Sequence, residues 1–262
     1  MLALRLQGLR RSFPATSAAF VENLSTGQGA SWNAGARLPA ASTLKVAIAV
    51  EVLRAMRGKP PSGSMLDTLI RAMLVDSSND AANTLEVYLA GSTGAGGARV
   101  NALMHSLGLV DTEMFGGYVR GTAVRDPIPV SVDDQPRLPL GKYTTARDLA
   151  QLLAYVHLAT EGRGLLAERY GYGFTPSDAR YLLYTLAHVA DRGKLGRFLG
   201  GSVLLAHKAG WIVQARHDAG LVYWPGGVFV AVVMTYGRSV GVASDLLAGR
   251  VARTALAVFG DN

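Results

Sequence analysis

Residues 40–50 have the sequence Ala-Ala-Ser-Thr-Leu-Lys-Val-Ala-Ile-Ala-Val, which places Ser42 three positions before Lys45. Apart from the lysine, this run is uncharged and apolar on all sides, which predicts a buried helix. Residues three apart share a helix face, so the Ser42 hydroxyl and the Lys45 amine can meet. A buried lysine must be paired or lose its charge, and a neutral lysine beside a serine at a helix N-terminus activates that serine as a nucleophile. An N-cap serine followed by an unrelated lysine would give the same pattern.

The composition is that of a folded globular protein and excludes several kinds of chemistry. With 262 residues and 49% hydrophobic content, the chain can form one large domain or two closely packed ones. The net charge is +7, but the basic residues are scattered, so no nucleic acid partner is expected. The absence of cysteine excludes thiol catalysis, disulfides and cysteine-ligated metals. The histidines show no metal-ligand spacing, so neither a metal nor an organic cofactor is implied.

Neither end of the chain predicts a membrane segment. Residues 1–12 are amphipathic and lack the apolar core of a signal peptide, so the protein is either cytosolic or made with a leader before Met1. The longest apolar stretch near the C-terminus, Val228–Met234, has the length of a strand and is too short to span a bilayer.

Hydrophobic periodicity divides the chain into a helical middle and β-rich ends. A short N-terminal helix and a hairpin at 18–24 and 30–33 precede helices predicted at 42–57, 65–75, 80–89, 99–107, 145–158 and 176–190. Strands are predicted at 203–207, 219–224 and 228–236, before a closing helix at 240–259. This order predicts an α/β fold in which segments 1–40 and 196–262 form one antiparallel sheet lobe and residues 41–195 form an inserted helical lobe. The cleft between the lobes is the expected ligand site.

Two segments interrupt the helical region. Residues 91–97, Gly-Ser-Thr-Gly-Ala-Gly-Gly, follow a helix and do not fit G-x-G-x-x-G, so a flexible connection is expected. Residues 116–141 contain four prolines and no helical period, which predicts a long irregular loop of the kind that is usually functional.

Two further motifs can supply polar groups to the cleft. Ser77-Ser78-Asn79 lies between two predicted helices, where it either points Ser77 and Asn79 into the cleft or simply caps the following helix. His207-Lys208-Ala209-Gly210-Trp211 ends a predicted strand, where Lys208 supplies a cation and Gly210 lets a ligand approach the main chain. The same lysine would also protect an edge strand.

The motifs S-x-x-K, S-x-N and K-x-G, in this order, resemble those of the penicillin-recognising serine enzymes, and most closely the class A β-lactamase family. Residues 77–83, Ser-Ser-Asn-Asp-Ala-Ala-Asn, are similar to that family's S-D-N-x-A-A-N, and residues 144–149 to its T-T-A-R-D-L helix start. The resemblance extends from about Ala18 to the C-terminus. It implies a five-stranded antiparallel sheet flanked by helices, with the active site between the sheet and a helical lobe.

The resemblance also implies catalytic roles. Ser42 would be the acylated nucleophile and Lys45 its proton acceptor or the orienter of one, while Ser77 would relay a proton to the leaving nitrogen. Lys208 would keep the site electropositive and help to seat a substrate carboxylate. Asn79 would bind the substrate amide.

Further contacts to the substrate are implied on the strand side of the cleft. The backbone N–H groups of Ser42 and Trp211 would form an oxyanion hole, in which each donor typically contributes about 3–4 kcal/mol. Gly210 would allow the substrate to approach, and Arg216 is a candidate for binding its carboxylate.

The chain departs from the family pattern in its cleft walls. The segment from Ser42 to Ser77 is shorter than usual, so part of the helical lobe is trimmed. Ala209 replaces the usual Thr or Ser of K-T-G, which removes a hydroxyl for the substrate carboxylate and costs about 1.5–3 kcal/mol of binding.

The third departure concerns the water-activating glutamate that the family carries in the loop at 116–141. The only carboxylates of this loop are Asp126, Asp133 and Asp134, and none lies in a recognisable motif. Glu113, just before the loop, is expected to be structural. We therefore expect acylation followed by slow deacylation.

The leading prediction is a serine acyl-transfer hydrolase of the β-lactamase type, acting on a β-lactam or a peptidoglycan-like amide. A D-alanyl-D-alanine carboxypeptidase, a penicillin-binding protein or an esterase would use the same residues. A non-catalytic envelope binding or sensor protein could keep the fold, but the intact Ser42 and Lys45 argue against it. The resemblance implies a periplasmic or extracellular location, and a monomer is expected.

Overall fold

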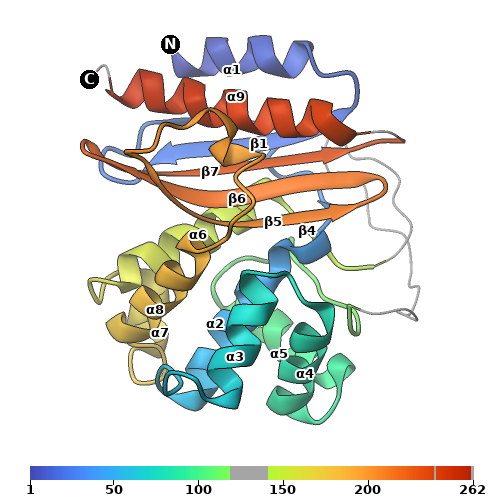
Figure 1. The fold of residues 1–262 in the computed structure, drawn as a ribbon, viewed down its shortest axis with the longest axis vertical. Helices are drawn as coiled ribbons and strands as arrows, with labels where there is room; N and C mark the ends of the chain where they lie inside the picture. The colour runs from blue at the N-terminus through green and yellow to red at the C-terminus, as the bar shows by residue number, and fades with distance from the viewer. Residues whose placement is uncertain (119–140, 239, 261–262) are drawn as a thin grey trace.

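The computed structural model describes residues 1–118, 141–238 and 240–260 (Figure 1). The α-helices are α1 (Leu2–Arg11), α2 (Lys45–Met56), α3 (Met65–Leu74), α4 (Asn79–Ala90), α5 (Thr93–Ser106), α6 (Ala146–Ala159), α7 (Gly164–Tyr170), α8 (Pro176–Ala187) and α9 (Gly241–Gly260). The strands are β1 (Thr16–Asn23), β2 (Gly29–Trp32), β3 (Leu38–Pro39), β4 (Tyr143–Thr144), β5 (Leu204–Ile212), β6 (Ala215–Trp224) and β7 (Gly227–Tyr236). Two short 3-10 helices are η1 (Ala41–Leu44) and η2 (Leu195–Phe198).

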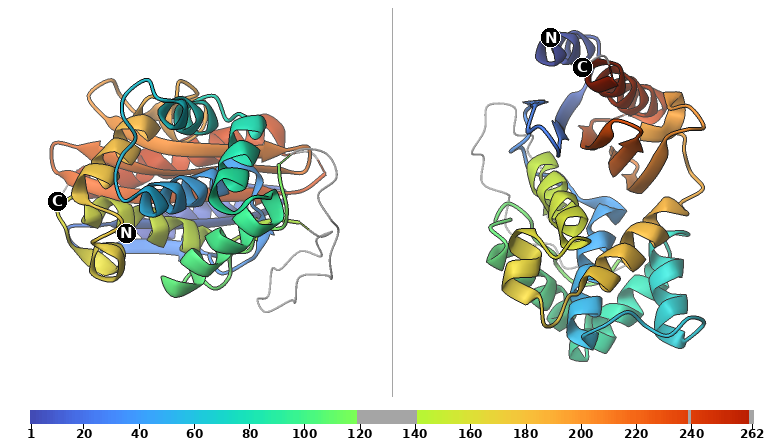
Figure 2. Two further views of the ribbon diagram at one scale, coloured as in Figure 1. Left: turned by 90° about the horizontal axis from the view of Figure 1, so that it is seen from below. Right: turned by 90° about the vertical axis from the view of Figure 1, so that its left-hand side faces the viewer.

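Five strands form one antiparallel sheet in the order β2-β1-β7-β6-β5. Strands from both ends of the chain therefore share one sheet. Helices α1 and α9 cover one face, and the helical region from α2 to α8 lies on the other (Figures 1 and 2). Edge strand β5 runs beside η1. The predicted α/β class and antiparallel sheet are confirmed, whereas the exact division of the chain into lobes stays a prediction.

The sheet is buried on both faces, because its central strand β7 is apolar at nearly every position. Val230 and Val232 pack with the helical region, whereas Phe229 and Val233 pack with α9 on the opposite face. A strand covered on both sides reads as a continuous hydrophobic run, which explains the sequence Val228–Met234.

The helix predicted to start at Ser42 begins three residues later. Ala41, the first residue of the tighter turn η1, has φ +47°, a left-handed conformation. Helix α2 then starts at Lys45. Most of α2 is buried, from Lys45 to Leu53, which agrees with its apolar sequence.

The prediction of a flexible connection at residues 91–97 is wrong. Gly91, at φ +81°, ends α4, and the Ser92 side chain caps α5 by accepting from the Ala95 N–H (3.1 Å). The glycines that follow are helical, because α5 packs very closely on α4. A Cβ atom on Gly96 would lie 2.3 Å from the backbone oxygen of Glu86, so only glycine fits there.

Candidate active site

The turn η1 holds Ser42 against the edge strand of the sheet. A Cβ atom on Gly210 of β5 would lie 2.9 Å from the Ser42 nitrogen and 3.0 Å from the Thr43 nitrogen. The Thr43 hydroxyl closes the turn by donating to the carbonyl three residues earlier (2.6 Å). His217 of β6 donates from Nε2 to the Pro39 carbonyl (2.6 Å), and burial lowers its pKa to about 4, so the ring is neutral. The Ser42 backbone is thereby fixed next to β5.

Lys45 is fully buried at the first position of α2. Its Nζ donates to the Ser77 carbonyl (2.5 Å) and to Asn79 Oδ1 (2.8 Å), and it lies 3.4 Å from Ser77 Oγ. Burial, followed by the charges of Lys208 and Lys142, lowers its pKa from 10.5 to about 7. A neutral amine has two N–H donors and one lone pair. Because the two short bonds use both donors, the lone pair is left to accept a proton.

Ser77 lies in the connection between α3 and α4, and its own conformation is strained. Its φ is +57°, which is uncommon for a residue other than glycine. The next residue, Ser78, is the one that caps α4, by accepting from the Ala81 N–H (3.2 Å). Since Ser78 performs the capping, the Ser77 hydroxyl remains available to the cleft.

Lys208 approaches the same hydroxyl from β5. Its Nζ donates to Ser77 Oγ and to the Ala209 carbonyl, each at 2.9 Å. Burial lowers the pKa of Lys208 to about 8, although the charge of Asp218 opposes this effect. Because Ser77 Oγ accepts from a lysine, its own proton can be donated elsewhere.

Tyr118 and Lys142 close the site below Lys45. The Tyr118 ring centroid lies 4.8 Å from the Lys45 Nζ and 4.5 Å from the Lys142 Nζ. Lys142 donates to the carbonyls of Gly117 (2.5 Å) and Phe115 (3.3 Å). Burial lowers its pKa as well. The site therefore combines three lysines of lowered pKa with two serines, Ser42 and Ser77.

Sequence comparison gives the same result as these motifs and their geometry. A family model described as the Beta-lactamase enzyme family matches residues 1–64 and 56–259 of the chain. The chain belongs to this family. A search of curated proteins finds no relative by sequence.

Solved structures of several β-lactamases and of PBP-A share the fold. A structure of PBP-A is 23% identical with a TM-score of 0.76 and covers 100% of this chain and 96% of that chain. A β-lactamase from Streptosporangium roseum is 18% identical with a TM-score of 0.76 (100% and 99% covered), and one from Sphaerobacter thermophilus is 21% identical with a TM-score of 0.72 (100% and 97% covered). At these identities the likeness concerns the fold alone.

The structure brings together most of the site residues predicted from the motifs of this β-lactamase-family chain. Hydrogen bonds and a close backbone approach between elements connect Ser42, Lys45, Ser77, Asn79, Lys208 and Gly210 in one cluster. Trp211 follows Gly210 on β5, and its side chain is 67% exposed, so a contribution to the oxyanion hole rests on its backbone N–H.

Arg216 lies beside Trp211 on the neighbouring strand, but its side chain does not join this cluster. Strand β6 begins at Ala215, so Arg216 lies within it, and its side chain points to the opposite face from that of the neighbouring His217. Its Nε donates to Asp245 of α9 at 3.0 Å. Binding of a substrate carboxylate by Arg216 therefore stays a prediction.

Of the four acids named in and just before the segment 116–141, only one lies among the described residues. Asp126, Asp133 and Asp134 lie outside the described residues. Glu113 accepts from the Asn101 side chain (2.6 Å) and forms a β-bridge with Tyr143, which agrees with the structural position expected for it.

Three residues of the cluster were missed by the sequence analysis: Tyr118, Lys142 and Glu86. The first two flank the segment 119–140 and belong to no motif. Glu86 stands on the buried face of α4, four positions after Ala82, so a charged residue in an apolar stripe was the signal that could have identified it.

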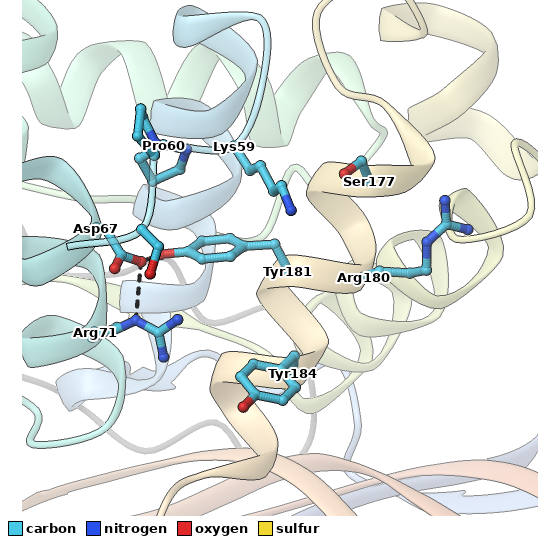
Figure 3. A pocket seen from close by; sticks show the side chains of 10 residues that line it. Lys59, Pro60, Asp67, Arg71, Ser177, Arg180, Tyr181 and Tyr184 are labelled. Atoms are coloured by element: carbon cyan, nitrogen blue, oxygen red, sulfur yellow. Dashed lines mark hydrogen bonds and ion pairs between the residues drawn. The ribbon is translucent and has the colours of Figure 1, made fainter. Parts of the chain in front are cut away.

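A hollow lies between α3 and α8 (Figure 3). Its volume is about 560 Å³, and its acid Asp67 accepts from Arg71 (2.9 Å) and from the Tyr181 hydroxyl (2.6 Å). The Asp67 carboxylate is thus occupied by these two partners.

Within the described ranges, no group of three or more side chains is suited to hold a metal ion. None of the helices in these ranges is long and apolar enough to form a transmembrane segment.

Proposed function

We propose that this protein is a serine hydrolase of the β-lactamase type in which a β-lactam or a related amide acylates Ser42. The observation that carries the proposal is the approach of two lysines of lowered pKa to one hydroxyl. The Nζ atoms of Lys45 and Lys208 lie 3.4 and 2.9 Å from Ser77 Oγ. This arrangement supports a short proton path from the nucleophile to a leaving nitrogen.

In the acylation step, Ser42 Oγ adds to the carbonyl carbon of the amide while its proton moves to the neutral Lys45 amine. When the C–N bond breaks, the nitrogen keeps the electron pair and takes the proton of the Ser77 hydroxyl. Ser77 then regains a proton from Lys45. The products are an ester at Ser42 and an N–H on the leaving group, and Lys45 is neutral again.

The strand side of the cleft supports binding of an anionic substrate. The backbone N–H groups of Ser42 and Trp211 would stabilise the developing oxyanion, and Asn79 would bind the substrate amide. Lys208 would attract the carboxylate of a β-lactam. Because position 209 is alanine, this carboxylate loses one hydroxyl partner, which favours modest affinity for ordinary penicillins.

We further propose that the acyl group leaves slowly. Deacylation needs a base that activates water. Among the described residues, no carboxylate forms a hydrogen bond with Lys45 or Ser77, and the Tyr118 ring occupies the space beside Lys45. Slow release would give the protein the behaviour of a penicillin-binding protein or carboxypeptidase towards β-lactams. One structural neighbour, the L158E mutant of PBP-A, was solved as an acyl-enzyme complex with penicillin G.

A periplasmic or extracellular location and a monomeric state complete the proposal, because β-lactams and peptidoglycan-like amides are met outside the cytoplasm.

Intact-protein mass spectrometry after incubation with penicillin G tests the proposal. We expect an adduct of the mass of the intact drug that persists for minutes in the wild type and is absent in Ser42→Ala. Rapid loss of the drug without an adduct would refute slow release. If neither adduct nor turnover appears with penicillins, cephalosporins or D-alanyl-D-alanine peptides, acylation at Ser42 by these amides is refuted.

A further inference from the structure

Glu86 is a fully buried acid that the proposed reaction does not use. Neither of its carboxylate oxygens has a hydrogen-bond partner among the described residues. Helix α5 seals the position, because a Cβ atom on Gly97 would lie 4.0 Å from Glu86 Oε1. The other fully buried glutamate, Glu51, is instead paired with Arg54 (2.7 Å) and Arg99 (2.8 Å). An unpaired buried carboxylate is costly, so Glu86 differs from an ordinary structural acid.

The surroundings of Glu86 are those of the active site. Asn79 and Asn83 lie seven and three positions before Glu86, on the same face of α4. Asn79 Oδ1 accepts from Lys45 (2.8 Å), and Asn83 Oδ1 accepts from the Tyr118 N–H (2.6 Å), so this face is turned to the site. The charges of Lys142 and Lys45 act on the Glu86 carboxyl group, and its own charge raises the pKa of Tyr118. The Tyr118 ring contacts both ammonium groups, and its buried hydroxyl also has no partner in the described part of the chain. From β5, Lys208 adds a further positive charge that acts on Lys45. Glu86 is thus an acid whose charge acts on both Lys45 and Lys142.

We propose that Glu86 is a positioning residue for Lys45: its buried carboxylate favours the protonated form of Lys45 and so shifts the pH at which this amine can accept a proton. For its effect on acylation this inference rests on the proposed function, in which Lys45 must be neutral. An ionised Glu86 stabilises the ammonium form of Lys45, whereas a protonated Glu86 does not. Burial raises the pKa of Glu86 to about 7, the value to which that of Lys45 falls. Near neutral pH the charge of each group therefore influences the protonation of the other.

The direct test is a titration of the lysine side chains by NMR, without any substrate. The chain has only five lysines, so ¹³C-labelled lysine side chains give few signals, which single substitutions assign. In Glu86→Gln we expect the midpoint of Lys45 to fall by about half a unit or more, because an attractive charge has been removed. Glu22→Gln, which removes the same charge from β1, is the matched control and should leave Lys45 unchanged. An unchanged Lys45 midpoint in Glu86→Gln overturns the proposal.

A second measurement connects the titration to acylation. In single-turnover acylation by penicillin G, the acid limb of the pH–rate profile should move to lower pH in Glu86→Gln by the same amount as the Lys45 midpoint. A merely structural role would instead lower the rate at every pH and leave the limb in place, which would contradict the proposal.

Two results distinguish failure of this inference from failure of the proposed function. If penicillin acylates none of the variants, the proposed function fails, but the lysine titration still decides whether Glu86 controls Lys45. If Glu86→Gln does not fold, Glu86→Leu replaces the acid by an apolar side chain, a change that buried charges often tolerate. Loss of folding in both variants would show that the fold itself requires Glu86 and would overturn the proposal.

Discussion

Replacing Gly210 by alanine should disable Ser42 without unfolding the protein. The added Cβ atom would lie 2.9 and 3.0 Å from the nitrogens of Ser42 and Thr43, which is 0.5 and 0.4 Å less than the 3.4 Å at which ordinary contact begins. Both atoms are backbone, so neither can swing away as a side chain would. The turn η1 and strand β5 must therefore separate by about half an ångström.

A displacement of this size has consequences for rate and stability. Since a misplacement of about 1 Å costs about 100-fold in rate, half an ångström should reduce acylation about tenfold or more. Overpacking typically destabilises by about 1–3 kcal/mol, which in a chain of this size lowers Tm by about 2–10 °C. Acylation is measured by stopped-flow binding of a fluorescent penicillin at a temperature well below the Tm.

The matched control is Gly8→Ala in α1, where the new Cβ atom meets nothing within 4 Å. This change should leave acylation unchanged and stabilise the helix by about 0.5–1 kcal/mol. Wild-type acylation by folded Gly210→Ala would refute the idea that close approach of β5 positions Ser42. An equal loss in both variants would refute it too.

Three further outcomes follow from the titrating and buried groups. The rate of acylation by a carboxylate-bearing β-lactam should rise as the pH passes about 7, where Lys45 loses its proton. The apparent affinity of the protein for this β-lactam should fall above about pH 8, where Lys208 loses its charge, and a flat stopped-flow profile from pH 6 to 9 would contradict both assignments. Lys45→Met should gain more thermal stability at pH 6 than at pH 9. Between about pH 7 and 10.5 the unfolded chain holds a lysine proton that the folded protein lacks, so the folded wild type is destabilised most at low pH. An equal gain in Tm at the two pH values would count against the lowered pKa. Glu51→Gln should lower the free energy of unfolding, measured by urea denaturation, by about 1–3 kcal/mol, because it weakens the bonds to Arg54 and Arg99. The partial exposure of the two arginines limits the loss. A variant as stable as wild type would show that these bonds contribute little.

The sequence identifies the side chains of the site better than their surroundings. Ser42, Lys45, Ser77 and Lys208 were predicted because polar residues at fixed spacing stood at the ends of recognisable elements. The side on which the Arg216 side chain lies depends on the strand boundary. Since β6 begins at Ala215 rather than at the predicted residue 219, the strand's alternation fixes the face on which Arg216 lies.

Composition was misleading where packing determines the structure. Four glycines in residues 91–97 favour a loop on propensity alone, yet three of them lie in α5. The close approach of α5 to Glu86 on α4 requires glycine at Gly96, and no local pattern contains that contact. Tyr118 and Lys142 were missed for a related reason, because their roles arise only when segments far apart in sequence meet around Lys45.

Lys45 both holds its neighbours in position and can accept a proton. Its bond to the Ser77 carbonyl holds a residue whose left-handed φ costs about 1–3 kcal/mol, and its bond to Asn79 fixes the first turn of α4. These two bonds satisfy a neutral amine, whereas an ammonium carries a third donor that Ser77 Oγ, at 3.4 Å, meets only weakly. Protonation therefore removes the lone pair that would accept the Ser42 proton and also draws Nζ towards Ser77 Oγ, the group that Lys208 already contacts. A titration that alters Lys45 should accordingly change proton transfer and the position of Ser77 together, and the pH profile of acylation would report both.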